Sequence, residues 1–205
     1  MKKLFADRPK ILLTAVLVCS GLAALIFFNT DLSAKTDSRG MDRLFSTLSV
    51  IKVPPAKDPI RINLEDLNGK SISISDFKDK IVFLNFWTTW CPTCRIEMPS
   101  MEKLHQKLKN KDFAMVTVNL RESVSKVKAF FKEFKLTFTA LLDSTGLVGA
   151  SFGIRSIPTT YILDKTGRII GRVNGPREWD SKAAIALFEN LMDKDAVAGT
   201  SEAAN

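Results

Sequence analysis

Residues 81–94 read IVFLNFWTTWCPTC, and this stretch decides the fold. Its first half, Ile81–Trp87, is a compact apolar run, typical of a strand that is buried on both faces of a sheet. The two cysteines, Cys91 and Cys94, stand where a helix is expected to begin. Pro92 fits there because the first helical turn has no use for the N–H that proline lacks. A buried strand followed at once by a helix predicts an α/β domain.

Strands and helices alternate through the rest of the chain. Residues 61–75 alternate apolar and polar side chains around Asn68-Gly69, a dipeptide able to take positive φ angles, which predicts an N-terminal hairpin. Later segments follow the periodicities of strands and helices, and predict a central mixed β-sheet flanked by helices. The expected strands and extended segments are 113–120, 138–142, 159–163 and 168–173, and the expected helices are 98–108, 123–135, 147–152 and 180–192. We place this single domain at residues 58–193 and expect a flexible tail at 194–205.

The N-terminus predicts a membrane anchor. A basic segment, Met1–Lys10, precedes the uncharged and mostly apolar run Ile11–Phe28. A helix of that length is close to the ~30 Å thickness of a bilayer core, so it can span the membrane. The basic flank is expected to stay in the cytoplasm, which puts the domain on the outer side, joined by a linker at residues 31–57. A cleaved signal peptide is the alternative, although Phe27-Phe28-Asn29-Thr30 makes a poor cleavage site.

The composition excludes several classes of protein. The chain has 205 residues with three cysteines, one histidine and a net charge of +8. Because a zinc ribbon needs four ligands at paired spacings, this inventory cannot build one, and a multi-histidine metal centre is excluded as well. Basic and aromatic residues do not interleave as a nucleic-acid stacking platform would require. With Cys19 inside the apolar run, the remaining two cysteines are expected to act as a pair.

The spacing of Cys91 and Cys94 predicts thiol-disulfide chemistry. Unpaired backbone N–H groups at the helix N-terminus stabilise a thiolate at Cys91, which lowers its pKa from the free value of about 8.5. Cys94 lies one turn inside the helix and can close the ring after Cys91 has attacked a substrate disulfide. A purely structural disulfide is the alternative interpretation, but a loop this short stabilises a fold little.

Three segments carry a resemblance to a known family: FLNFWTTWCPTCRIEMPSMEKL, GIRSIPTTYILDKTGRI and GPREW. They resemble the membrane-anchored thioredoxin-like proteins of the TlpA/ResA group and are also similar to the CcmG proteins of cytochrome c maturation. The resemblance covers roughly residues 58–192. It implies a thioredoxin-like fold in which the helix from Ser123 and the extended segment near Phe138 form a TlpA-type insertion.

The resemblance assigns roles to particular residues. Cys91 and Cys94 match the redox-active disulfide of the family, and Ile157-Pro158 matches its cis-proline loop, which offers backbone to an extended substrate segment. Trp90 matches a residue of the docking surface beside the exposed sulfur. The docking residues predicted in this way are Trp90, Pro92, Thr93, Ile157 and Pro158.

Glu97 is the candidate for moving protons at the inner cysteine. Cytoplasmic thioredoxins have an aspartate six residues before the first cysteine, but Asn85 stands at that position here. Glu97 follows Cys94 by one helical turn and matches the active-site glutamate of the family. A carboxyl in a desolvated pocket would have a raised pKa and could exchange a proton with Cys94. The alternative is a surface glutamate that stabilises the first turns of the helix.

The expected function is therefore thiol-disulfide exchange, with the direction of electron flow as the main question. Strongly oxidising thiol proteins often place a histidine between the cysteines, and Thr93 cannot stabilise a thiolate by charge. Together with the resemblance, this favours a reductase of exported proteins in cytochrome c or oxidase assembly, supplied by a membrane electron donor of the DsbD or CcdA type. The alternatives are a general disulfide oxidase or isomerase and a Cu(I)-binding assembly factor. We expect no cofactor and no bound metal.

Overall fold

The computed structural model describes residues 39–54 and 56–202. The chain divides into two compact units, Met1–Arg43 and Leu44–Asn205, and in the first of them residues 39–43 are helical. Across the described ranges, no helix combines the length and the apolar character needed to cross a bilayer. The predicted anchor, residues 11–28, lies outside those ranges.

The second unit is built on one eight-stranded mixed sheet with the order β1-β8-β7-β4-β5-β6-β2-β3. The neighbours β4, β5 and β6 run parallel, and the other pairings are antiparallel. This confirms the predicted central mixed sheet. The strands are β1 Ile51–Lys52, β2 Asn63–Asp66, β3 Ser71–Ser73, β4 Ile81–Trp87, β5 Phe113–Leu120, β6 Thr139–Asp143, β7 Thr159–Leu163 and β8 Ile169–Asn174.

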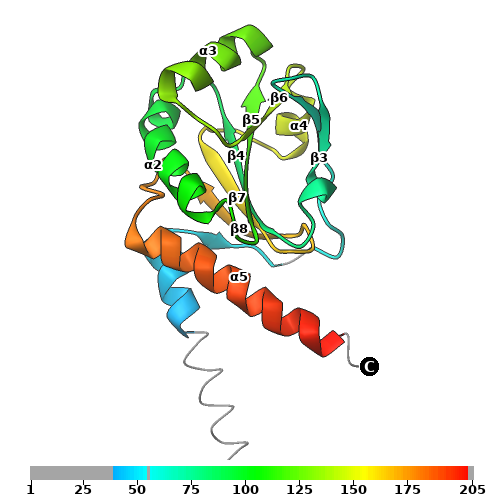
Figure 1. The fold of residues 1–205 in the computed structure, drawn as a ribbon, viewed down its shortest axis with the longest axis vertical. Helices are drawn as coiled ribbons and strands as arrows, with labels where there is room; N and C mark the ends of the chain where they lie inside the picture. The colour runs from blue at the N-terminus through cyan, green and yellow to red at the C-terminus, as the bar shows by residue number, and fades with distance from the viewer. Residues whose placement is uncertain (1–38, 55, 203–205) are drawn as a thin grey trace, which may run out of the picture. The chain divides into compact units, whose positions relative to one another are not determined.

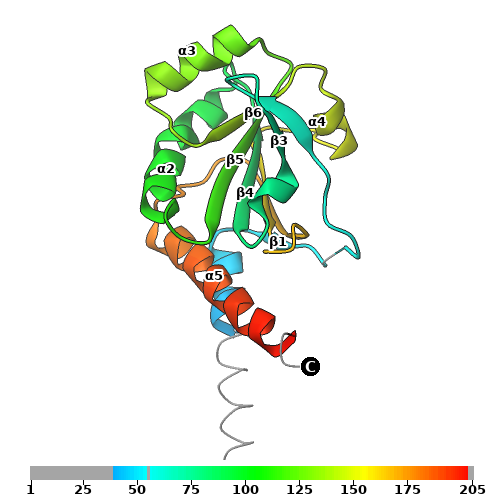
Figure 2. The same cartoon turned by 45° about the vertical axis from the view of Figure 1, so that its right-hand side comes forward.

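Helices cover both faces of the sheet, so that α2 and α4 lie on opposite sides of the central strands (Figure 1, Figure 2). Phe83 of β4 contacts Phe188 of α5, and Trp87 of β4 contacts Phe130 of α3, whereas Phe86 points the other way and contacts Phe152 beyond α4. Alternate side chains of β4 therefore enter two cores, which is why all seven of its residues are buried. The helical elements are η1 Ile74–Phe77, α2 Pro92–Leu108, α3 Val124–Phe134, α4 Leu147–Ser151 and α5 Lys182–Glu202.

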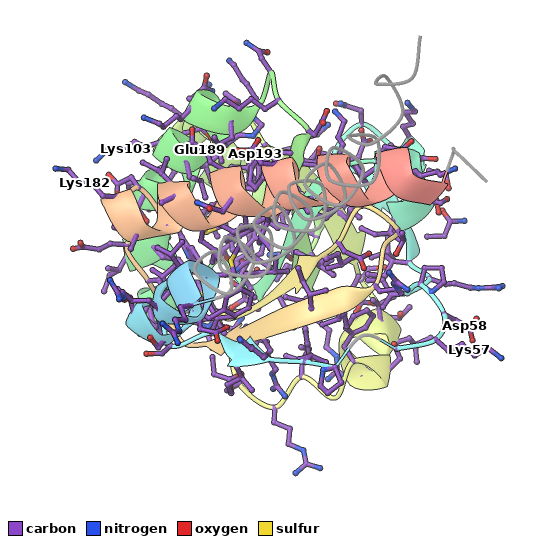
Figure 3. All side chains as sticks on the ribbon, turned by 90° about the horizontal axis from the view of Figure 1, so that it is seen from below. Lys57, Asp58, Lys103, Lys182, Glu189 and Asp193 are labelled. Carbon is purple, nitrogen blue, oxygen red and sulfur yellow. A yellow bond between two sulfur atoms is a disulfide. The ribbon has the colours of Figure 1, made fainter. Side chains whose placement is uncertain are left out.

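Helix α5 is tied to α2 at the end where α5 begins. Lys103 of α2 forms an ion pair of 2.9 Å with Asp180, just before α5, and Figure 3 shows Lys103 on the same side as Lys182. Trp179, also in the segment before α5, packs edge-on against Phe83 of β4 with ring centroids 4.7 Å apart. These contacts hold the segment before α5 against α2 and β4.

The structure adds to the predicted elements at two places. The hairpin is confirmed as β2 and β3, but β1 lies inside the segment predicted as a linker, because it extends the sheet along the edge of β8. Gly171 of β8 allows this approach, since a Cβ there would lie 2.8 Å from Val50 Cγ1. Helix α5 runs on to Glu202, through residues predicted as a tail, and the alanines in this stretch favour helix.

Candidate functional site

The two cysteines lie where β4 ends and α2 begins. Cys91 is the residue that precedes the first turn of α2, and its Sγ accepts a hydrogen bond of 3.2 Å from the backbone N–H of Cys94. The two residues form a disulfide with their Cα atoms 5.3 Å apart. Cys91 keeps 3% of its surface exposed, whereas Cys94 is fully buried. Cys91 is therefore the sulfur nearer to solvent, as the spacing of the motif predicts.

The other predicted docking residues surround Cys91. Its Sγ lies 3.3 Å from Thr93 Oγ1 and 3.9 Å from the carbonyl oxygen of Ile157, although the two segments are far apart in sequence. The peptide bond between Ile157 and Pro158 is cis. Trp90 is 65% exposed, unusual for so large an apolar side chain. Of the five predicted docking residues, Thr93 and Ile157 therefore contact Cys91, Trp90 and Pro92 are exposed next to it in the chain, and Pro158 is buried.

Glu97 is not on the surface of α2. Its side chain is 1% exposed and faces β4 and the segment before α5. Its Oε1 accepts a hydrogen bond of 3.1 Å from Asn85 Nδ2, and its Oε2 accepts one of 3.0 Å from Trp179 Nε1. Burial raises the pKa of Glu97 from 4.5 to about 7, and these hydrogen bonds limit the rise because they stabilise the carboxylate. The surface interpretation of Glu97 is thereby excluded.

Sequence reasoning missed the segment that holds Glu97 in place. The backbone N–H of Arg177 donates to Glu97 Oε2 over 3.3 Å, and Ser100 Oγ bonds to the carbonyl of Glu97 and accepts from the N–H of Trp179. The Arg177 side chain extends away and donates from Nε to the carbonyl of Leu48 over 2.8 Å. No local pattern links residues so far apart. The stretch GPREW carried only the resemblance. Nothing in this local sequence indicated that Trp179 would donate a hydrogen bond to Glu97.

Asn85 occupies the interior of β4 beneath Glu97. Its Nδ2 donates both to Glu97 and to Thr160 Oγ1 of β7, the latter over 3.0 Å. Its Oδ1 is buried and has no hydrogen-bond partner. The position that holds an aspartate in cytoplasmic thioredoxins therefore carries a neutral amide in direct contact with the buried carboxyl.

A second buried acid, Glu122, supports the loop that leads into Cys91. It follows β5, and its carboxylate accepts hydrogen bonds from the backbone N–H and the hydroxyl of Thr89, at 2.6 and 2.7 Å. Lys126 forms an ion pair with it at 2.6 Å, and Asn119 Nδ2 donates to it over 2.9 Å. Burial raises the pKa of Glu122, but the hydrogen bonds it accepts, first from Lys126, outweigh that effect and hold the pKa below its ordinary value.

The arrangement supports thiol chemistry more directly than metal chemistry. Within residues 39–54 and 56–202, no three histidine, cysteine or acidic side chains lie close enough together to share a metal ion. The side chains that could hold a soft ion such as Cu(I) are the reduced forms of Cys91 and Cys94 themselves. In the oxidised protein their sulfurs are joined to each other.

Comparisons with known proteins agree with this geometry. The Redoxin family model matches residues 52–187. The chain is 37% identical to the thiol-disulfide oxidoreductase ResA of Bacillus thuringiensis subsp. konkukian, over 60% of this chain and 72% of that protein. It is 46% identical to the thioredoxin-like protein YneN of Bacillus subtilis, over 52% of this chain and 64% of that protein.

The solved structures include StoA from Bacillus subtilis, with a TM-score of 0.55 and 30% identity, covering 64% of this chain and 99% of StoA. This chain belongs to the Redoxin family and is a thioredoxin-like thiol-disulfide oxidoreductase whose redox pair is Cys91 and Cys94.

Proposed function

We propose that this oxidoreductase works as a reductase of disulfides in exported proteins, with Glu97 as the group that exchanges a proton with Cys94. The observation that carries this proposal is a fully enclosed carboxyl one turn beyond the inner cysteine, whose pKa lies near 7. A general acid or base is most effective when its pKa is close to the working pH. A purely structural disulfide does not require a nearby carboxyl that exchanges protons near neutral pH.

The reaction begins with both cysteines reduced. The Cys91 thiolate attacks one sulfur of the substrate disulfide, so that a mixed disulfide forms and the other substrate sulfur leaves as a thiolate. The Cys94 thiol then gives its proton to the Glu97 carboxylate and attacks Cys91. This closes the ring between Cys91 and Cys94 and releases the second substrate thiolate. Two electrons have passed to the substrate, and Glu97 holds the proton that Cys94 lost.

The substrate segment is expected to lie in extended form along Ile157 and Pro158. The carbonyl of Ile157, close to Cys91, offers a backbone acceptor to such a segment. Trp90, which precedes Cys91 in the chain, supplies an exposed aromatic surface. Pro92 and Thr93, both exposed, are the other residues that we assign to the docking surface.

The cellular setting of this proposal comes from the N-terminal sequence and the resemblance. Residues 11–28 would anchor the chain in the bacterial cytoplasmic membrane, with the catalytic domain on the outer side. There the oxidised pair must be reduced again from across the membrane, by an integral electron donor of the DsbD or CcdA type. The proposed substrates are exported proteins whose thiols must be free for cytochrome c or oxidase assembly.

Equilibrium titration against dithiothreitol and glutathione tests the direction of electron flow. We expect a midpoint potential near that of thioredoxin, about −270 mV, for the full chain in detergent micelles. A midpoint near −120 mV, the value of the strong oxidant DsbA, would refute the reductase proposal and favour a disulfide oxidase. The same titration of Glu97→Gln at several pH values checks the proton step, because the dependence of the potential on pH near 7 should change.

A further inference from the structure

The two carboxyl oxygens of Glu97 have different surroundings. Oε2 faces two N–H groups, Trp179 Nε1 at 3.0 Å and the backbone nitrogen of Arg177 at 3.3 Å. Neither group can accept a hydrogen bond. When Glu97 takes up a proton, Oε2 therefore offers the proton no acceptor, and the proton belongs on Oε1.

Oε1 faces the side-chain amide of Asn85. In the structure the Asn85 amide presents its nitrogen, which donates to Oε1 at 3.1 Å and to Thr160 Oγ1 at 3.0 Å. This orientation suits a carboxylate. A proton on Oε1 would point at the amide N–H, while the natural acceptor, Asn85 Oδ1, is buried on the other side of the same amide without a partner. A half-turn of this amide would not remove the cost of an unpartnered buried atom, because the amide nitrogen would take the place of Oδ1; what it would relieve is the contact of an O–H with an N–H at Oε1.

We propose that the Asn85 amide turns over when Glu97 gains or loses its proton, so that Asn85 is a positioning residue for both protonation states of the carboxyl. A half-turn about the Cβ–Cγ bond exchanges the amide nitrogen and oxygen. Oδ1 then accepts the O–H of Glu97, and it also accepts from Thr160, because a hydroxyl both donates and accepts. Between the two states Glu97 gains or loses its proton, Thr160 changes from acceptor to donor, and the amide nitrogen and oxygen exchange places. This inference rests on the proposed proton exchange by Glu97.

The turning amide lets a buried proton carrier be hydrogen-bonded in both of its protonation states. N–H donors stabilise a buried carboxyl only in its ionised form. A proton carrier, however, must gain and lose its proton in every cycle. Trp179 and Arg177 hold Oε2 in both states and fix the direction of the carboxyl. Asn85 changes its bonding with Oε1, so neither state leaves that oxygen facing a mismatched group.

The charges around Glu97 allow its titration to be observed alone. On the segment before α5 the charged neighbour is Arg177. On α2 the cysteines that the proposed function couples to Glu97, Cys91 and Cys94, are joined in a disulfide. The strands beneath it supply the uncharged Asn85 and Thr160. Because a disulfide does not titrate, the oxidised protein isolates the proton of Glu97 from the coupled protons of the thiols.

The chain contains a matched control for Asn85. Asn119 of β5 also donates from Nδ2 to a buried glutamate, Glu122, and its Oδ1 is also buried without a partner. Glu122, however, forms an ion pair with Lys126, and its pKa is lowered instead of raised. Glu122 therefore stays ionised near neutral pH, and the Asn119 amide should keep one orientation.

Nuclear magnetic resonance of the oxidised full chain in detergent micelles, labelled with ¹⁵N-asparagine, tests the turn. We expect Overhauser contacts between the Nδ2 hydrogens of Asn85 and the Thr160 side chain at pH 9, and their loss at pH 5. The loss should follow the titration of the Glu97 carboxyl, measured by ¹³C. Asn119 should keep its contacts throughout. Contacts of Asn85 that persist at both pH values, or that Asn119 loses equally, would overturn the proposal.

Two substitutions provide an independent test of the same proposal. Trp179→Phe removes a donor that serves the carboxylate only, so the titration midpoint of Glu97 should rise by about one pH unit. Asn85→Leu removes a partner of both states and should move the midpoint by less than half as much. An equal rise in both variants would show that Asn85 is only a donor, and an unmoved midpoint in Trp179→Phe would show that Oε2 is not held as described.

The outcome also separates this inference from the proposed function. If Glu97→Gln exchanges thiols at the wild-type rate with an unchanged pH profile, Glu97 is not the proton carrier, yet the turning of Asn85 remains measurable. If the Asn85 contacts with Thr160 persist at low pH while Glu97→Gln is impaired, the proton role stands and the turning is refuted.

Discussion

Burial of Glu97 should make the stability of the oxidised protein fall as the pH rises. Its pKa moves from 4.5 in the unfolded chain to about 7 in the folded protein, mainly because the carboxyl is removed from water. Between these two values the folded protein holds a proton that the unfolded chain has released. A rise in pH across this window therefore favours the unfolded chain, and above pH 7 the effect is complete.

The magnitude follows from the size of the change in pKa. Each unit corresponds to about 1.4 kcal/mol, so Glu97 alone should lower the free energy of unfolding by about 3 kcal/mol between pH 4.5 and pH 7. Glu97→Gln removes this dependence, because glutamine fills nearly the same volume and does not titrate. Any constant cost of the amide among the donors Trp179, Arg177 and Asn85 shifts the variant equally at every pH.

The measurement is urea unfolding of the oxidised full chain in detergent micelles, for the natural protein and for Glu97→Gln, at several pH values from 4 to 8. Other titrating groups contribute equally to both proteins and cancel in the difference. We expect the natural protein to lose about 3 kcal/mol relative to the variant across this range. A difference that does not depend on pH would refute the reasoning, because it would mean that burial leaves the proton affinity of Glu97 unchanged.

Three further outcomes are expected. Cys94→Ser should accumulate a mixed disulfide through Cys91, detected by mass spectrometry, whereas capture through position 94 in Cys91→Ser would show that the two roles are reversed. Trp90→Ala should raise the KM for a protein disulfide about tenfold with little effect on a small disulfide, and Ile51→Ala, an exposed apolar residue on edge strand β1, should leave both unchanged. Equal losses with both disulfides would argue against docking by Trp90. Glu122→Ala should lower the free energy of unfolding by about 3 kcal/mol, since it leaves the N–H of Thr89 and the amide of Asn119 without their acceptor. Glu133→Ala, which breaks the exposed ion pair with Arg95, should cost less than about 1 kcal/mol, and similar costs would contradict the structural role of Glu122.

Local patterns were enough to predict most of the fold and the redox pair. The run Ile81–Trp87 predicts β4 because six apolar and aromatic residues around the single polar Asn85 suit a strand with a core on each face. Cys91 and Cys94 follow at the start of a helix, and residues three apart on a helix are neighbours, so the spacing alone brings the two sulfurs together. Strand β1, which lies within the predicted linker, depends instead on a distant partner, because it pairs with β8.

The sequence by itself determined where the thiols lie and which of them comes nearer to solvent, because these depend on residues within one strand and one turn of helix. It left two interpretations of Glu97 open, since spacing along a helix does not distinguish a surface acid from a buried one. Only the tertiary structure decided between them. Asn85 from β4 and Trp179 from the segment before α5 meet at the carboxyl through folding alone. The removal of water by these distant segments, more than any neighbour in sequence, is what raises the pKa of Glu97.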